Sequence, residues 1–268
     1  MPELKLESYV QEVLNDEIER DDRFLEVEDL EHLLRDENDG EVPRSGIFGY
    51  PSSPLYRELA NMLQLWMTNR WCPIFDLPKY GLLDETVYVE TRAATVASIT
   101  PLLEGLLTLW ELWGREEIKF RIRQVMLLLG KRGLLDILGV RKTVGSTNMW
   151  PTSRKKLLAS FLEKHSPNSK ICVGARALSK HYHRDESTSW WGNCTGTEEN
   201  KNTHALQIVL KILDHATWIN IHWLPHDLFI LEVRQAEGYG ARWSADGSTF
   251  RGFLEPQMIG GHDAGWKH

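Results

Sequence analysis

Four short segments near the end of the chain decide its fold: WINIHW at 218–223, LFILEVR at 228–234, YGARW at 239–243 and FRGFL at 250–254. Apolar and polar residues alternate along much of these segments, as is typical of strands that turn one face to a core. The connections are short, and the last one contains the turn-forming pair Asp246 and Gly247. We therefore predict an antiparallel meander of four strands.

Helical patterns occupy most of the chain before this meander. Ser153 and Thr203 belong to the residue types that commonly cap helices, and each precedes a periodic apolar pattern. Two earlier helices are expected to start at Ser53-Pro54 and at Thr100-Pro101, where proline suits the first turn. The second should reach about Leu138, with a break at Gly130–Gly133. Three segments are less regular: 84–98 fits a strand or a helix, 171–174 looks like a buried strand, and 180–202 reads as a long ordered loop.

These patterns predict an α+β protein, with a helical N-terminal half followed by a small antiparallel sheet and a packed helix. We expect residues 1–40 to form an acidic helical arm, which is amphipathic over 6–36, and residues 41–165 to form a helical scaffold. Residues 166–268 are expected to form an α+β part that carries the site and to be continuous with the scaffold in one compact domain.

The composition favours an intracellular protein. The three cysteines are widely spaced and form no CxxC pair, so neither a disulfide framework nor a zinc finger is indicated. The N-terminus does not resemble a secretory signal. The apolar stretches 102–113 and 125–140 contain charges and are short for a bilayer, so we expect no membrane association. Cytoplasmic or nuclear localisation follows as the expectation.

The net charge of −7 is distributed unevenly along the chain. The first forty residues are strongly acidic, whereas 115–156 carry eleven Lys and Arg residues against three carboxylates. Such asymmetry indicates a phosphate-rich partner or an internal acidic segment that covers a basic face, and it is equally consistent with two separately solvated helix surfaces.

Eight of the ten histidines lie between His181 and His268, which points to a site in the last third of the chain. His181 and His183 are two residues apart, and Asp185 follows them. Convergence of His181, His183, His222 and His226 through the tertiary fold would suit a divalent metal ion such as zinc or iron. The alternative is that these imidazoles are hydrogen-bonding or acid–base groups without a metal.

Strand alternation predicts that one sheet face carries His222, Glu232, Arg234, Arg242 and Arg251. Guanidinium groups on a rigid sheet suit carboxylates or phosphates, because each presents a fork of donors. We therefore assign substrate binding to the three arginines and Glu232, together with Trp191 from the preceding loop, and proton transfer to His181, His183, His222 and Asp185. The alternative is a solvated face with cross-strand salt bridges.

Sequence motifs do not name a reaction. The chain contains no GxxxxGK[ST] loop, no GxSxG elbow, no GxGxxG turn and no HExxH pair. GYGARW at 238–243, FRGFLEP at 250–256 and the ending GHDAGWKH resemble an uncharacterised family of plant and fungal proteins. The resemblance covers about the last hundred residues and implies no activity.

The leading hypothesis is an intracellular enzyme, such as a hydrolase, or an enzyme-like binder of a small anionic substrate. The alternative is a non-catalytic interaction protein that binds RNA or another polyanion through the basic helices 115–156. The sequence does not indicate the reaction, the oligomeric state or whether a metal binds.

Overall fold

The computed structural model describes residues 6–39, 46–78, 86–184, 189–224 and 228–256. Its elements confirm the predicted α+β class, because a helical N-terminal half precedes a four-stranded antiparallel sheet. The helices are α1 (Leu6–Ile18), α2 (Val27–Leu34), α3 (Leu55–Asn69), α4 (Thr86–Leu109), α5 (Arg115–Ile137), α6 (Arg154–Leu162), α7 (Val173–His181) and α8 (Glu198–Asp214). The strands are β1 (Trp218–Leu224), β2 (Leu228–Arg234), β3 (Gly240–Ser244) and β4 (Phe250–Leu254).

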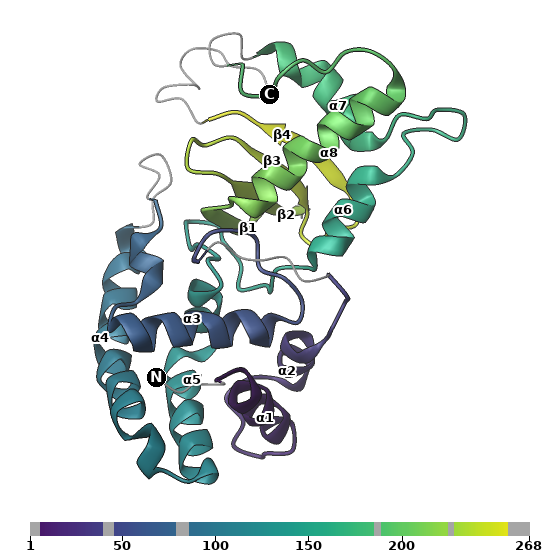
Figure 1. Ribbon diagram of the computed structural model, residues 1–268. Helices are drawn as coiled ribbons and strands as arrows, with labels where there is room; N and C mark the ends of the chain where they lie inside the picture. Colours follow the sequence, from purple (N-terminus) through teal and green to yellow (C-terminus); the bar gives the residue numbers. More distant parts are fainter. Residues whose placement is uncertain (1–5, 40–45, 79–85, 185–188, 225–227, 257–268) are drawn as a thin grey trace.

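The sheet is the predicted meander, with strand order β1-β2-β3-β4. Val233 pairs with Ile219 on one side and with Ala241 on the other, so these apolar residues line the same face. They are buried, and helices α6, α7 and α8 pack against the sheet on this face. Figure 1 shows α8 running across the sheet, with the helical half α1–α5 below it.

The predicted acidic arm consists of two helices, α1 and α2, that belong to the core of the helical half. Val10 and Leu14 of α1 are completely buried, and α1 packs against α3 and α5. Leu30 and Leu33 of α2 are equally buried. The arm is therefore an integral layer of the scaffold, because its removal would expose this apolar surface to water.

The predicted helix start at Thr100-Pro101 is wrong, because α4 begins at Thr86 and continues through Pro101. Proline removes one helical hydrogen bond and leaves the carbonyl of Ala97 without its donor. Ala97 and Pro101 both lie on the exposed side of α4, so water can hydrogen-bond to this carbonyl. The ambiguous segment 84–98 is accordingly helical from Thr86 onward.

The predicted buried strand at 171–174 is also wrong, because it forms the start of α7. Cys172 caps this helix, with its sulfur accepting a hydrogen bond from the backbone N–H of Ala175. Gly174 allows the helix to approach α6 closely, since a Cβ atom there would lie 2.1 Å from the ring of Phe161. The apolar run thus serves helix packing and not a sheet.

Two helices start at positions other than those predicted, whereas the cap of α6 and the break in α5 are confirmed. Helix α8 begins after Thr197 and not after Thr203, because Thr197 accepts the capping hydrogen bond from the N–H of Asn200. The loop predicted over 180–202 is therefore shorter. Helix α3 starts one residue late, with Pro54 in the cap position. The cap at Ser153 is confirmed, as is the break in α5, where Gly130 has a φ of 55°.

The segment that follows α5 joins the two halves of the protein. The backbone N–H groups of Arg141 and Thr147 donate to the carbonyls of Ile219 and Ile221 at 2.7 and 2.8 Å. The N–H of Trp223 donates back to the carbonyl of Gly145 at 3.0 Å. Segment 140–147 therefore runs along the outer edge of β1 and holds the end of α5 beside the sheet.

One helix region, Tyr88–Leu112, is long and apolar enough to cross a bilayer by length and composition alone. It contains 25 residues, and its most apolar window has a mean hydropathy of 1.3. Only 17% of that window is buried, whereas the core helix of a soluble protein would be mostly buried. The region Tyr88–Leu112 also contains Arg92, which pairs with Asp136 of α5. A single such helix is weak evidence for membrane insertion.

Candidate functional site

The face of the sheet opposite α8 carries a buried carboxylate between two guanidinium groups. Glu232 is only 3% exposed, and it accepts a hydrogen bond from Nε of Arg234 at 2.6 Å and another from Nη2 of Arg242 at 2.8 Å. Burial by itself raises the pKa of Glu232, but the two guanidiniums outweigh it and hold this pKa below its ordinary value. The face therefore carries a fixed carboxylate charge at neutral pH.

The three predicted arginines differ in what they can still bind. Arg234 is buried and uses its Nη1 group for the carbonyls of Gly238 and Glu255, at 2.6 and 2.8 Å. Arg242 is 29% exposed, and its described hydrogen bonds go to Glu232 alone, through Nε and Nη2. Arg251 is exposed, beside the irregularity in the pairing of β3 with β4. Arg242 is thus an oriented guanidinium with a side open to solvent.

His222 lies on the same face as the Glu232 carboxylate, on the neighbouring strand. Asn220 pairs with Glu232, and His222 follows two residues later along β1. Burial lowers the pKa of His222, and the charges of Arg242 and Arg234 lower it further, against the opposing effect of Glu232. The imidazole is therefore neutral at neutral pH and able to accept a proton.

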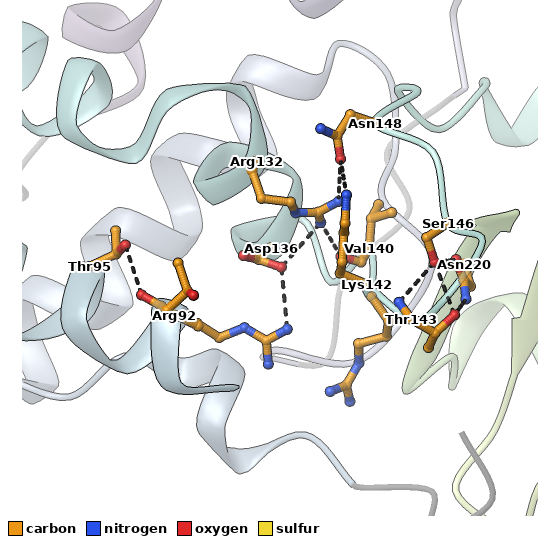
Figure 2. A network of polar contacts seen from close by, with 12 residues as sticks. Arg92, Thr95, Arg132, Asp136, Val140, Lys142, Thr143, Ser146, Asn148 and Asn220 are labelled. Carbon is orange, nitrogen blue, oxygen red and sulfur yellow. Dashed lines mark hydrogen bonds and ion pairs between the residues drawn. The ribbon is translucent and has the colours of Figure 1, made fainter. Parts of the chain in front are cut away.

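A polar network ties this face to segment 140–147 (Figure 2). Ser146 donates to Oδ1 of Asn220 at 2.7 Å, and Nδ2 of Asn220 donates to Oγ1 of Thr143 at 2.9 Å. Next to Thr143, Lys142 donates to Asn148, which also accepts a hydrogen bond from Arg132 of α5. Sequence reasoning missed Thr143, Ser146 and Asn148, because no spacing in 140–148 reveals that the segment meets β1.

His181 and Trp191, in contrast, lie on the helix-covered side of the sheet. The two rings meet edge to face at 4.9 Å, and both contact Phe253. Nε2 of His181 lies 2.7 Å from Oε1 of Glu255, a distance that suits an ion pair, although the orientation makes a poor hydrogen bond. Trp191 is completely buried. These side chains form an aromatic cluster between α7 and β4, separated by the sheet from His222.

Of the remaining predicted site residues, His183 is the one that the structure describes. His183 is exposed in the turn that follows α7. Asp185 and His226 lie outside the described residues. Within the described ranges, no group of three or more His, Cys, Asp or Glu side chains is arranged to hold a metal ion. The structure therefore brings His222 together with Glu232 and Arg242, whereas His181 and His183 lie elsewhere.

The acidic helices cover much of the basic surface that the sequence predicted. Carboxylates of α1 and α2 form ion pairs with four cations of α5, namely Arg115 with Glu12, Lys119 with Asp16, Arg123 with Glu17, and Lys131 with Asp29. Of the interpretations of the charge asymmetry, an acidic segment that covers a basic face is the one observed. Much of the positive charge of α5 is thereby neutralised within the protein.

Residues 162–255 match the family model of the CdiA C-terminal tRNase toxin domain. No curated protein and no solved structure matches the chain. A family signal in the C-terminal part is thus confirmed, but it comes from a bacterial toxin family and not from the plant and fungal family that the sequence suggested. The match gives no support to a small anionic substrate on this face. Residues 162–255, which run from the end of α6 through β4 and include the Glu232 face, are similar to a tRNase toxin domain.

Proposed function

We propose that the part of the chain from α7 to β4 acts on RNA and cleaves it on the sheet face that carries His222, Glu232 and Arg242. One observation carries the proposal: the oriented, partly exposed guanidinium and the neutral imidazole lie on one face, within the segment that is similar to a tRNase toxin domain. A phosphodiester backbone is the anionic group that such a face suits.

The geometry supports a cleavage reaction that needs only side chains. In RNA, the 2′-hydroxyl can attack the adjacent phosphorus once a base removes its proton; the new P–O bond closes a 2′,3′-cyclic phosphate, and the 5′-oxygen leaves and takes a proton from solvent water. His222 is the proposed base, because burial keeps its imidazole unprotonated. Arg242 would donate to the phosphoryl oxygens as their negative charge grows. Glu232 holds that guanidinium in place and is a positioning residue.

The polar side chains beside His222 hold its strand in place. Asn220 is buried and fixed by Ser146 and Thr143, so the strand that carries His222 is held rigidly at its edge. A rigid support keeps a general base within hydrogen-bond reach of its proton, which matters because small displacements cost large factors in rate. The 2′-hydroxyl requirement would make the activity specific to RNA.

The test is cleavage of purified tRNA and of an unstructured RNA, followed on denaturing gels. His222→Asn and Arg242→Gln are each expected to lower the cleavage rate by about 10²-fold or more, which is the contribution of a positioned base or charge stabiliser. His165→Asn is the matched control, since His165 is exposed in the loop after α6. A matching DNA strand should remain intact.

Binding separates the two parts of the proposal. RNA affinity should fall steeply as salt increases, because the bound phosphates release counterions. Salt-dependent binding without cleavage would retain the RNA partner and remove the catalytic role of His222. If the protein neither cleaves RNA nor binds it in a salt-dependent way, the proposal as a whole is contradicted.

A further inference from the structure

A cavity of about 230 Å³ lies between α4, α5 and the short helix Pro73–Asp76, away from the sheet face. A water molecule occupies about 30 Å³ in the liquid, so the volume corresponds to about eight waters, enough for a small organic molecule. Most of the wall is apolar or aromatic, and Arg92, Arg132, Asp136 and Lys142 form its charged part. The apolar and aromatic lining includes Trp66, Cys72, Ile74, Tyr88, Val96 and Leu129.

The charged part of the wall contains three cations and one carboxylate (Figure 2). Arg92 and Arg132 both donate to the same oxygen, Oδ1 of Asp136, at 3.4 and 3.1 Å. The ammonium group of Lys142 donates to Asn148, which carries no charge. Three positive charges and one negative charge leave a net charge of about two within the cavity wall.

The two guanidiniums are buried without full compensation. The side chain of Arg92 is only 8% exposed, and its Nε atom has no hydrogen-bond partner among the described residues. The Nε atom of Arg132 is also buried without a partner there. Burial lowers the pKa of Arg132, and the nearby charge of Arg92 lowers it further, although Asp136 opposes both effects. Burying two guanidiniums beside a single carboxylate is costly, and an anion bound in the cavity would offset part of their unbalanced positive charge.

We propose that this cavity binds a phosphate monoester, with the dianionic head held by Arg92, Arg132 and Lys142 and an organic body packed against the apolar wall. The net charge of the wall matches a dianion better than a carboxylate, and Arg and Lys are the side chains that recognise phosphate. Tyr88, whose ring centroid lies 5.4 Å from the ammonium group of Lys142, offers aromatic surface to a planar body such as a nucleobase. A free nucleotide and the terminal phosphate of an RNA strand share this chemistry. The inference does not depend on the proposed cleavage by the sheet face.

The test is calorimetric titration of the full chain with uridine monophosphate, with uridine as the matched ligand that lacks the phosphate. Uridine monophosphate is expected to bind at least about tenfold more tightly, because charge-assisted hydrogen bonds to the phosphate would be lost with uridine. Arg92→Gln and Lys142→Gln should each weaken nucleotide binding by about tenfold or more. Arg121→Gln is the control, since Arg121 lies on α5 and pairs with Glu117 away from the cavity.

Two further arms identify the source of the phosphate. A short RNA with a terminal phosphate is compared with the same RNA ending in hydroxyl groups: preferential binding of the former assigns the cavity to RNA ends, and binding of the mononucleotide alone assigns it to free nucleotides. Either result supports a phosphate monoester site. If Arg92→Gln fails to fold, as circular dichroism would show, Lys142→Gln decides, because its side chain is only partly buried.

Three results would overturn the inference. They are equal affinity for uridine monophosphate and uridine, unchanged affinity in the folded Lys142→Gln variant, and the absence of any nucleotide or phosphate binding up to about 1 mM ligand. Because His222→Asn and Arg242→Gln do not touch the cavity, they should leave nucleotide affinity at the cavity unchanged. Failure of RNA cleavage and failure of this site are therefore distinguishable.

Discussion

Replacement of Glu17 by glutamine tests whether the acidic helices are a structural part of the fold. Glu17 is completely buried, and its carboxylate accepts three hydrogen bonds: from Nε and Nη2 of Arg123 at 2.8 and 3.0 Å, and from the backbone N–H of Phe24 at 3.0 Å. The variant keeps one acceptor oxygen and turns an amide NH₂ toward the guanidinium or the backbone N–H. A donor then faces a donor, and the charge of Arg123 loses its buried partner.

The expected loss follows from burial. Breaking a buried ion pair costs about 3–5 kcal/mol. Arg123 is 16% exposed and keeps its contacts with Asp22, to the carbonyl at 2.8 Å and to the carboxylate at 3.3 Å, so we expect a loss at or just below the lower end of this range, about 2–3 kcal/mol. Glu7→Gln is the matched control on the same helix: Glu7 and Arg57 are both more than half exposed, and their pair should contribute less than about 1 kcal/mol.

The assay is urea unfolding followed by tryptophan fluorescence. The midpoint of Glu17→Gln should shift to lower urea with an unchanged slope, which reports a change in the free energy of unfolding and not in the surface exposed. Equal midpoints for Glu17→Gln and Glu7→Gln would refute the argument. They would mean that the buried carboxylate of Glu17 contributes no more to the free energy of unfolding than the exposed carboxylate of Glu7. The acidic helices would then not be a structural part of the fold.

Three further predictions concern packing, thiol reactivity and pH. Gly174→Ala should destabilise the protein by about 1–3 kcal/mol in the same urea assay, because its Cβ would overlap Phe161, whereas Gly105→Ala, with open space around it, should be neutral or stabilising. Cys72 should resist a thiol reagent at pH 8 in the native protein and react after unfolding, since burial raises its pKa to about 12; rapid native labelling would contradict this. Burial also lowers the pKa values of His32 and His222, so the unfolded chain binds these protons first, and stability should fall as pH decreases below 6.5. His222→Asn should make that fall shallower in urea titrations between pH 5 and 7, and an unchanged slope would exclude His222 as a contributor.

Local periodicity predicts the sheet well but the helix starts poorly. The period of two in 218–254 gives the strands and their order, because a one-residue slip would move Ile219 and Val233 out of the core. Helix starts are hard to predict where several residues could cap the helix. Thr197 and Thr203 are both suitable capping residues, and in the structure Thr197 caps α8. The helix start predicted at Thr100-Pro101 was wrong because the helix continues through Pro101. It can do so because the carbonyl of Ala97, which loses its donor, is exposed to water.

In the candidate site too, strand alternation predicts some features, and others depend on tertiary packing. Alternation within strands places Glu232, Arg242 and His222 on one face, because that relation needs only the pleat and the register. It gives no information on His181, whose position depends on how α7 packs over the sheet. Nor does it reveal that Arg234 is bound by the carbonyls of Gly238 and Glu255, which makes Arg242 the partly exposed arginine beside Glu232. Sequence thus defines the members of the face, and tertiary packing decides which of them remain available.

The cavity lies beyond sequence reasoning for a different reason. Arg92 and Asp136 are separated by 44 positions, and their pairing exists only because α4 packs against α5. Segment 140–148, which carries Lys142 and Asn148, has no periodic pattern, yet its hydrogen bonds to β1 fix both the cavity wall and Asn220 beside His222. The two proposed binding places therefore share one connecting segment, whose conformation is set by the edge of the sheet. An irregular segment that pairs with a strand edge is where a search for further functional residues in this protein should begin.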